Sequence, residues 1–330
     1  MTTDVRWGFL GAGAMARTIA PCVHAAGGAR LQAVAARDVE RARRLGPHGA
    51  AYDSYDAVLA DDSVDAVYVA LANDAHAPWV LRAVEAGKHV LCEKPIGLDV
   101  AEVRAMAEAA AAHDRLVVEA SWYRWAPRTV RAEALVRAGA LGEVRRASSA
   151  FTGGGGDESN YRFDPHRGGG ALYDVGCYSV SAVLWAAGWA PLTWTEASLE
   201  RTDEGVDVRG RAQLTLGGVQ AEVRFGMRDE PAQTVLVEGD EARLEFVGDA
   251  FVSRFEVAEL AVGDTVERFA PCDPYQLMFE AVSRRIGGDQ TARVVGLDES
   301  LRVAEAIDAV FAADPHPAGA GPDRPERLPS

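Results

Sequence analysis

Two glycines between a strand-like run and a helix-like run constrain this chain more than any other feature. Gly11 and Gly13 follow the mostly apolar run 5–10 and precede 15–26, which is mostly apolar and has the length of a helix. In a strand–turn–helix unit, glycines let the backbone approach a pyrophosphate, and the helix N-terminus directs positive partial charge at it. With Ala16, the segment reads G-x-G-x-x-A and predicts a dinucleotide-binding turn. The residues expected to line this turn are Gly11, Gly13, Ala14 and Met15.

The end of the next predicted strand indicates which dinucleotide is bound. An NAD site usually has an acidic residue about twenty positions after the glycine motif, where it bonds the ribose 2′-hydroxyl. That position is Ala36 here, and the next residue is Arg37, whose guanidinium can pair with a 2′-phosphate. We therefore expect NADP, with Arg37 as a cofactor-binding residue. NAD remains open if Asp38 takes the acidic position.

Composition limits the class of protein and its partners. The chain has 330 residues, of which 48% are hydrophobic and 25% charged, as in globular proteins. Its net charge of −15 argues against nucleic acid or an anionic membrane as a partner, because either needs a basic face. The sequence has no signal-peptide pattern and no apolar run of membrane-spanning length. We expect a cytoplasmic protein.

The cysteines and lysines add two further indications. The four cysteines are scattered and make no C-x-x-C pair or metal-ligand spacing with the seven histidines, so no metal is expected. Arginine is abundant, whereas Lys88 and Lys94 are the two lysines of the chain. Lysine is the cation whose proton can be used in catalysis, so each of these two residues is a candidate for such a role.

The pattern of secondary structure changes near residue 121. Before it, strands and helices alternate, which is typical of a doubly wound, mostly parallel Rossmann sheet covered on both faces. The strands expected in this part are 5–10, 31–36, 66–70, 89–92 and 116–120. After it, consecutive alternating runs joined by short turns favour an open, mostly antiparallel sheet in an α/β domain. The strands expected there are 143–152, 192–199, 208–216, 219–225, 234–238, 242–247 and 251–257.

These patterns predict two domains and a tail. Residues 1–120 are expected to form the dinucleotide-binding Rossmann domain, and residues 121–313 the substrate-binding and oligomerisation domain. Residues 314–330 are rich in proline, glycine and charge and are expected to form a loose tail.

Polar residues follow two predicted strands at the edge where ligands of doubly wound sheets bind. Glu93 and Lys94 end the strand at 89–92, and Pro95 fixes the backbone beside them. Asn73 and His76 follow the strand at 66–70. We expect these residues to face the cofactor.

Together these motifs resemble the Gfo/Idh/MocA oxidoreductase family. The resemblance includes Gly11/Gly13/Ala16, the 73–76 segment, Ala86–Pro95 and the glycine-rich segment 168–178 of the second domain. It implies NAD(P)-dependent chemistry on sugars or related polyols, and an open sheet often used for oligomerisation. It is closest in pattern to the dihydrodiol/xylose dehydrogenase and sugar 3-ketoreductase branches, because Tyr178 stands where inositol dehydrogenases have histidine.

The resemblance implies three catalytic residues: Lys94, Asp174 and Tyr178. The chemistry of these groups supports the same assignment. Transfer of a hydride from a carbinol carbon needs a base for the hydroxyl proton, and the reverse reaction needs an acid. A free tyrosine has a pKa of about 10, and a nearby ammonium favours its phenolate. We expect Tyr178 to be the acid/base, Lys94 its electrostatic partner, and Asp174, four residues before Tyr178 on one helix face, to orient substrate or lysine. Gly176, between the two, leaves room for the cofactor.

The substrate remains open at this stage. Trp122, Tyr123 and Arg162 are candidate substrate-binding residues. One alternative is a free aldose or a cyclic diol, and the other is a nucleotide-linked ketosugar of deoxysugar biosynthesis. A less favoured alternative is a regulator that binds NADP without catalysis, because such a protein is expected to lose the lysine or its partner.

Overall fold

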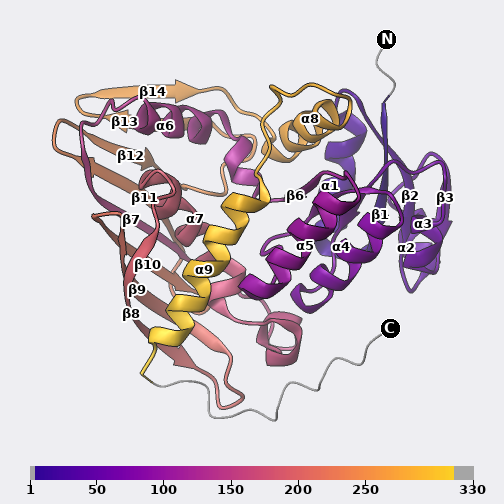
Figure 1. The fold of residues 1–330 in the computed structure, drawn as a ribbon, viewed down its shortest axis with the longest axis horizontal. Helices are drawn as coiled ribbons and strands as arrows, with labels where there is room; N and C mark the ends of the chain where they lie inside the picture. Colours follow the sequence, from indigo (N-terminus) through magenta and orange to yellow (C-terminus); the bar gives the residue numbers. More distant parts are fainter. Residues whose placement is uncertain (1–3, 316–330) are drawn as a thin grey trace. The chain divides into compact units, whose positions relative to one another are not determined.

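The six strands of the first sheet are all parallel, in the order β3-β2-β1-β4-β5-β6 (Figure 1). The strands are β1 (Val5–Leu10), β2 (Ala29–Ala35), β3 (Ala50–Tyr52), β4 (Ala66–Val69), β5 (His89–Cys92) and β6 (Val117–Glu119). The helices between them are α1 (Ala14–Ala25), α2 (Val39–Arg43), α3 (Tyr55–Leu59), α4 (His76–Glu85) and α5 (Val100–Ala112). Every residue of β4 is buried, as expected of a central parallel strand covered on both faces.

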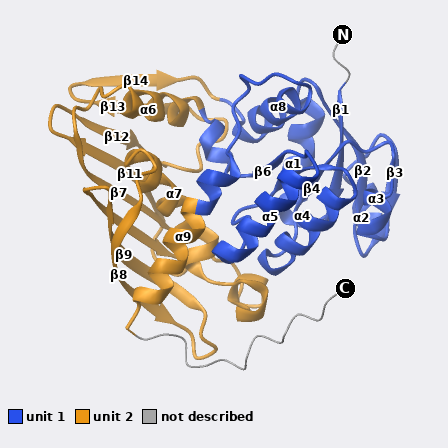
Figure 2. Ribbon diagram, in the orientation of Figure 1, with its two compact units in different colours: residues 1–126, 272–301 blue, residues 127–271, 302–330 orange. Residues whose placement is uncertain are grey.

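The computed structural model describes residues 4–315 and divides them into two units (Figure 2). The first unit comprises residues 4–126 and 272–301, and the second comprises 127–271 and 302–315. This division differs from the expected domains, because residues 272–301 return to the first unit.

Aromatic packing explains that return. Helix α8 (Pro274–Ile286) carries Phe279, whose ring centroid lies 4.9 Å from that of Trp7 on β1 and 5.6 Å from that of Tyr68 on β4. The indole Nε1 of Trp7 donates a hydrogen bond of 3.0 Å to Ser283 Oγ on the same helix. A helix from late in the chain therefore completes the core of the first unit. The sequence pattern does not reveal this long-range contact.

The second unit is built on an eight-stranded sheet in the order β14-β13-β12-β11-β7-β10-β9-β8. Its strands are β7 (Val144–Thr152), β8 (Leu192–Arg201), β9 (Asp207–Leu216), β10 (Val219–Gly226), β11 (Ala232–Gly239), β12 (Arg243–Val247), β13 (Ala258–Val262) and β14 (Thr265–Phe269). Only the β7–β10 pair is parallel among these strands. The expected fold class, a Rossmann domain followed by an α/β domain on a mostly antiparallel sheet, is confirmed.

Helices cover one face of this second sheet. Helix α7 (Cys177–Ala186) is buried along its whole length and packs on β7, β10 and β11, and α6 (Pro127–Arg137) packs on β13. The other face is exposed, as the alternation along β10 shows: Gln220, Glu222 and Arg224 are exposed between buried neighbours. Helix α9 (Leu297–Ala313) contributes residues to both units (Figure 2).

One expected strand of the second sheet is wrong. Residues 251–257 form a loop, and β13 and β14, which follow it, were not expected. The N–H groups of Phe251 and Val252 bond to the side chain of Gln233, at 3.0 and 2.8 Å, instead of to a neighbouring strand. Phe255 has a φ of 60°, which is incompatible with an extended strand.

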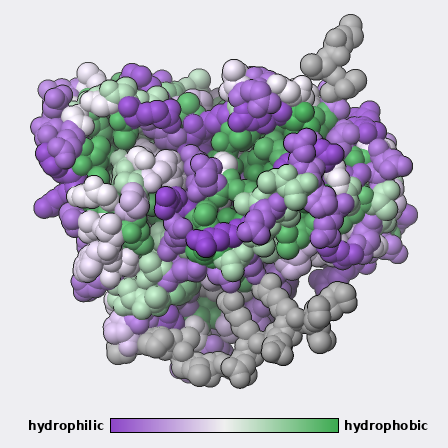
Figure 3. All heavy atoms as spheres, viewed as in Figure 1, coloured by the Kyte–Doolittle hydropathy of each residue, from purple (hydrophilic) through white to green (hydrophobic). Residues whose placement is uncertain are grey.

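The expected tail begins as ordered structure. Asp314 is 5% exposed and pairs with Arg201 of β8, because a carboxylate that is buried needs a cation or hydrogen-bond donors. Residues 316–330 lie outside the described residues. No helix in residues 4–315 is long and apolar enough to cross a membrane. Hydrophilic residues are spread over both units on the face drawn in Figure 3.

Candidate active site

The glycine turn has the geometry that a bound phosphate group needs. Gly11 has a φ of 108°, and a Cβ there would lie 2.6 Å from the carbonyl oxygen of Ala70, so only glycine fits. Gly13 is the N-cap of α1, and as a glycine it has no side chain that could cap the helix. A Cβ there would meet nothing within 4 Å. The N-terminus of α1, which begins at Ala14 and Met15, is therefore open to a ligand that accepts hydrogen bonds from its N–H groups.

Charges at the end of β2 favour a phosphate over a ribose hydroxyl. Arg37 is exposed, whereas Asp38 uses its carboxylate to cap α2 by accepting a 3.0 Å bond from Glu40 N–H. Arg41, in the first turn of α2, donates a 3.1 Å bond to the carbonyl of Ala12 in the glycine turn. Arg41 was not identified from the sequence, because no local pattern marks a bond to a carbonyl group 29 residues away.

Three buried side chains hold the turn that carries Lys94. His76 Nδ1 lies 2.7 Å from the carbonyl oxygen of Pro95, and burial lowers the pKa of this imidazole. Glu93 accepts a 3.3 Å bond from Lys94 N–H through one oxygen and a bond from Tyr68 Oη through the other. Glu119 accepts a 3.2 Å bond from the N–H of Ile96, and burial raises the pKa of its carboxyl. The peptide bond between Lys94 and Pro95 is cis.

For His76 the structure shows specific contacts, and for Asn73 it shows the position in the chain and the burial. His76 is fully buried and its Nε2 lies 3.3 Å from the carbonyl oxygen of Leu71, so both ring nitrogens face backbone oxygens. Its observed contribution is to hold the Lys94–Pro95 turn. Asn73 begins the short 3₁₀ helix η1 (Asn73–Ala75), shortly after the end of β4, and is 5% exposed.

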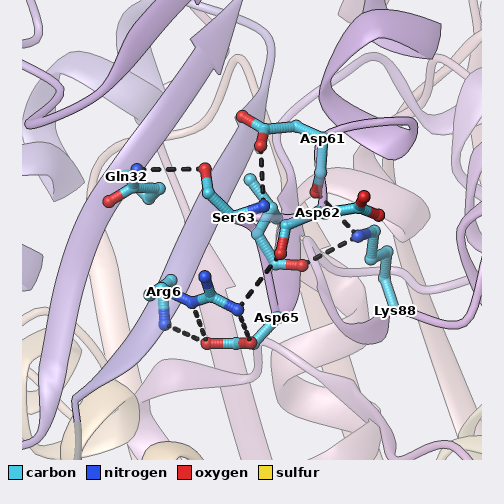
Figure 4. Close-up of polar contacts among 8 residues, drawn as sticks. Arg6, Gln32, Asp61, Asp62, Ser63, Asp65 and Lys88 are labelled. Atoms are coloured by element: carbon cyan, nitrogen blue, oxygen red, sulfur yellow. Dashed lines mark hydrogen bonds and ion pairs between the residues drawn. The ribbon is translucent and has the colours of Figure 1, made fainter.

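The other lysine has a structural role (Figure 4). The Nζ of Lys88 donates bonds of 2.9 and 2.8 Å to the carbonyl oxygens of Asp61 and Val64, which lie in the turn before β4. Burial lowers the pKa of this ammonium. Beside it, Arg6 pairs with Asp65 at 2.6 Å between Nη2 and Oδ1. Lys88 thus fixes this turn, and the chemical role expected of Lys94 stays a prediction.

The glycine-rich segment of the second unit leads into a widened helical turn. Residues Leu172–Gly176 form the π-helical turn η5, which continues directly into α7. The expected regular α-helix between Asp174 and Tyr178 is thus replaced in part by i→i+5 bonding, which often occurs at functional sites. A Cβ on Gly176 would lie 3.0 Å from Phe225 Cγ on β10. Close packing of this turn on the sheet is therefore an observed reason for glycine.

A buried aspartate holds the start of this turn. Asp207, the first residue of β9, accepts a 2.7 Å bond from Leu172 N–H, and burial raises the pKa of its carboxyl to about 6. A Cβ on Gly170 would lie 2.2 Å from Asp207 Oδ1, so glycine is required for this approach. Asp207 was missed in the sequence, because no local pattern marks an acceptor that is 35 residues from its donor.

Asp174 pairs with a residue that was expected to bind substrate. Arg162 Nε lies 2.8 Å from Asp174 Oδ1, and the two side chains are 25% and 11% exposed. The guanidinium of Arg162 also lies over the ring of Tyr161, 5.0 Å from its centroid. Asp174, in the π-helical turn before α7, thus balances the charge of Arg162.

The two expected aromatic substrate residues begin the short 3₁₀ helix η2 (Trp122–Trp125) in the first unit. Trp122 stacks on Tyr275 of α8, with ring centroids 4.4 Å apart and an angle of 19° between the planes. Tyr123 is 1% exposed. The described contact of Trp122 is therefore packing within the first unit, and contact of either residue with substrate stays a prediction.

Tyr178 lies in a cluster of aromatic rings within the second unit. Its ring centroid is 5.2 Å from that of Phe151 on β7 and 5.4 Å from that of Phe251 in the loop after β12. Tyr178 is 8% exposed. Lys94 belongs to the first unit and Tyr178 to the second, so the joint action of these residues stays a prediction.

Comparison with known proteins identifies both halves of the chain. Residues 5–121 match the model of an oxidoreductase family with an NAD-binding Rossmann fold. Residues 129–249 match the model of the GFO/IDH/MocA C-terminal domain. Together the two matches include the glycine turn, Lys94, Asp174 and Tyr178.

Relatives of known activity align over nearly the full length. The D-xylose 1-dehydrogenase (NADP(+)) 2 of Haloferax volcanii is 36% identical, and the alignment covers 92% of this chain and 96% of the relative. The trans-1,2-dihydrobenzene-1,2-diol dehydrogenase of Danio rerio is 28% identical over 93% and 94% of the two chains. A 3-ketoreductase from Actinomadura kijaniata, solved in complex with NADP and TDP-benzene, has a TM-score of 0.84 at 29% identity, covering 94% and 98%.

Proposed function

The chain belongs to the Gfo/Idh/MocA family of oxidoreductases, and we propose that it transfers a hydride between NADP and a carbohydrate hydroxyl or ketone. The observation that carries the proposal is that both candidate catalytic groups, Lys94 and Tyr178, stand on well-fixed segments. Lys94 stands on a turn that three buried side chains hold, and Tyr178 stands in the first turn of α7 among packed rings. Relatives that act on sugars and diols support the same reaction class.

The residues of the glycine turn fit a dinucleotide. Gly13, Ala14 and Met15 offer backbone N–H groups at an open helix N-terminus, and Arg37 with Arg41 supplies positive charge near the end of β2. Two arginines suit a 2′-phosphate, because guanidinium groups make strong, charge-assisted bonds to phosphate oxygens. When bound, NADP supplies the hydride acceptor for oxidation, or NADPH the donor for reduction. Glu93 and His76 would support the cofactor side of the site through the turn that they hold, and Asn73 remains a candidate for contact with the cofactor.

The proton chemistry falls to this chain's own residues. In oxidation, the Tyr178 phenolate takes the proton of the substrate hydroxyl, and in reduction the phenol returns it to the carbonyl oxygen. Lys94 stabilises the phenolate, since an ammonium favours a neighbouring anion. Asp174 and Arg162 together present one acceptor and one donor group to the sugar hydroxyls. Trp122 and Tyr123 remain candidates for contact with the sugar ring.

The charge balance of the second unit favours an uncharged substrate, namely an aldose or a cyclic diol. Several arginines close in sequence to the glycine-rich segment or on neighbouring strands pair with carboxylates. These pairs are Arg162–Asp174 at 2.8 Å, Arg209–Asp229 at 3.1 Å and Arg228–Glu158. A nucleotide diphosphate needs unbalanced positive charge, which these three pairs do not provide.

A substrate panel tests the proposal directly. Reduced nicotinamide absorbance is followed with aldoses, cyclic diols and a nucleotide-linked ketosugar, each with NADP(H) and NAD(H). The proposal predicts turnover of an aldose or diol with NADP at a kcat/KM far above that of the nucleotide ketosugar. Preference for the nucleotide ketosugar would favour the 3-ketoreductase alternative, and cofactor binding without turnover of any class would favour a regulator.

We also propose a homo-oligomer formed through the exposed face of the second sheet, in the cytoplasm. Strand register places Trp194, Val247 and Val266 on that face, and they are 49%, 41% and 56% exposed. These side chains lie on β8, β12 and β14 of this exposed face, and a second copy of the chain would bury them. Light scattering of the protein and of Val266→Glu tests this: a multimer that dissociates in the variant supports it, and a monomeric parent protein contradicts it. The four cysteines are thiols, consistent with a reducing compartment.

A further inference from the structure

The loop that follows β12 holds one face of the proposed acid/base. Phe251 in this loop and Phe151 on β7 are nearly parallel, with centroids 5.4 Å apart and an angle of 7° between the rings. The ring of Tyr178 is tilted against both, at 61° to Phe151 and 56° to Phe251. Phe251 is 1% exposed. The two phenylalanines therefore limit how far the phenol ring can tilt, and Phe151 is itself fixed in the centre of the sheet.

Phe251, by contrast, belongs to no strand, and side-chain bonds fix it in addition to the backbone bond of its neighbour Ala250 to Gln233. Gln233 on β11 lies opposite Phe151 in the strand register. Its Oε1 accepts two hydrogen bonds from the loop, at 3.0 Å from Phe251 N–H and at 2.8 Å from Val252 N–H. One side-chain oxygen thus replaces the strand partner that this part of the chain lacks.

Arg128 of α6 fixes the same loop from another side. Its guanidinium donates to the carbonyl oxygens of Val247 and Ala250, both at 3.0 Å, and to that of Asp249. Arg128 is 2% exposed, and burial lowers its pKa to about 10. Burying a cation is costly unless its hydrogen bonds are made, so the bonds to these carbonyls also retain the loop in place.

Beyond Phe251 the loop turns outward. Val252, Phe255 and Val257 are 44%, 64% and 58% exposed, so their side chains contribute little packing that could fix the loop. The position of Phe251 therefore depends on the bonds from the Gln233 side chain and Arg128, together with the 3.3 Å backbone bond from Ala250 N–H to the Gln233 carbonyl oxygen.

We propose that Gln233 and Arg128 are positioning residues for Tyr178, because by fixing residues 247–252 they hold the Phe251 ring against the tyrosine. This inference rests on the proposed acid/base role of Tyr178. Proton transfer depends on the alignment of donor and acceptor, and a displacement of about 1 Å can cost about 100-fold in rate.

Gln233 offers a matched pair of variants, and Phe251 a second approach. Gln233→Leu removes the acceptor for both N–H groups at similar size, whereas Gln233→Glu keeps it. Phe251→Leu removes the ring while leaving the backbone bonds. Arg128 is not varied first, because loss of a buried cation and its bonds is expected to impair folding.

For Gln233→Leu and Phe251→Leu, kcat for sugar oxidation is expected to fall about 10- to 100-fold. The dissociation constant of NADPH, followed by fluorescence, should stay within about twofold. The rising limb of the kcat–pH profile should move to higher pH, since the proposed help from Lys94 requires the phenol in place. Gln233→Glu should keep kcat and the profile near those of the parent protein.

The outcomes separate this inference from the proposed function. Parent-like kcat and pH profile in Gln233→Leu and Phe251→Leu, with an inactive Tyr178→Phe, overturn the positioning role alone. Equal losses in Gln233→Leu and Gln233→Glu, or a parallel loss of NADPH binding, also overturn it, because they indicate general damage. An active Tyr178→Phe overturns the proposed function itself.

Discussion

Arg162 and Asp174 form an ion pair in the second unit, with Nε and Oδ1 2.8 Å apart and both side chains partly accessible to solvent. The two residues were expected to act separately, Arg162 on the substrate and Asp174 on substrate or lysine. As a pair they present a neutral, strongly hydrogen-bonding edge, which suits hydroxyl groups better than phosphates.

Asp174→Asn should therefore change substrate preference. Removing the carboxylate leaves the Arg162 charge unbalanced, so the ratio of kcat/KM for a phosphorylated sugar to that for the free sugar is expected to rise about tenfold or more. This estimate takes a charge-assisted bond as about 1.5–3 kcal/mol. Steady-state kinetics on matched sugar and sugar phosphate measures the ratio. The double variant with Arg162→Gln should lose the gain, and an unchanged ratio in Asp174→Asn would contradict the neutral-edge interpretation.

Arg37 and Arg41 should determine the choice between NADP and NAD. Loss of either guanidinium removes charge-assisted bonds to the 2′-phosphate, so the dissociation constant of NADPH should rise about 10- to 100-fold while that of NADH stays unchanged. Fluorescence titration of Arg37→Ala and Arg41→Ala measures both constants. Arg43→Ala serves as the control, because Arg43 lies on the same helix and pairs with Glu40 in the parent protein. Equal effects on NADPH and NADH would contradict the assignment.

Asp207 should make stability depend on pH between about 4 and 6. Its folded-state pKa is raised from 3.8 to about 6, so the folded protein binds the proton more tightly than the unfolded chain. The stabilising contribution is fully present below about pH 4 and is lost as pH rises through about 6. A shift of this size is worth about 3 kcal/mol at most.

Asp207→Asn tests this by urea unfolding at pH 4.5 and 7. The asparagine oxygen can still accept the bond from Leu172 N–H but does not titrate. Between pH 4.5 and pH 7 the parent protein should therefore lose more unfolding free energy than the variant, because only the parent protein carries the Asp207 carboxyl. Identical pH dependence of the two proteins would show that this carboxyl is not the group responsible.

Gly176→Ala should lower stability through overpacking. The added Cβ would lie 2.9 Å from Leu172 Cδ1 and 3.0 Å from Phe225 Cγ, so one of them must move. Inserting a methyl into a well-packed region costs about 1–3 kcal/mol, and thermal unfolding should begin at lower temperature. Gly27→Ala is the control, because a Cβ at Gly27 would meet nothing within 4 Å. Equal melting temperatures for the two variants would rule out a packing role for Gly176.

Sequence reasoning succeeded where the signal is local. The glycine turn at Gly11 and the strand end at Lys94 are each specified by a few neighbouring residues, and the structure has both. It failed where distant parts of the chain meet. Nothing near Phe279 indicates that its helix completes the first core, and the acceptor for Leu172 N–H comes from Asp207, far along the chain.

The loop at 251–257 shows a second cause of error. Its odd-numbered positions are mostly apolar and its even-numbered positions mostly polar, as in a half-buried strand. In the structure Phe251 is buried against Tyr178, whereas Phe255 is exposed and adopts a positive φ. Periodicity does not distinguish a strand from a loop that is held by side-chain hydrogen bonds. The bonds here come from Gln233, which lies outside residues 251–257, so the sequence of this segment does not reveal them.

The joint action of Lys94 and Tyr178 is the central claim, and a double-mutant cycle measures it most directly. kcat/KM for the aldose or diol substrate is determined for the parent protein, Lys94→Met, Tyr178→Phe and the double variant, with NADPH binding as the folding control. Each single change should cost about 10²- to 10⁴-fold, and the double variant should lose little more than the worse single one, because residues that act as a unit are not additive. Fully multiplicative losses, or near-normal turnover in either single variant, would contradict the account.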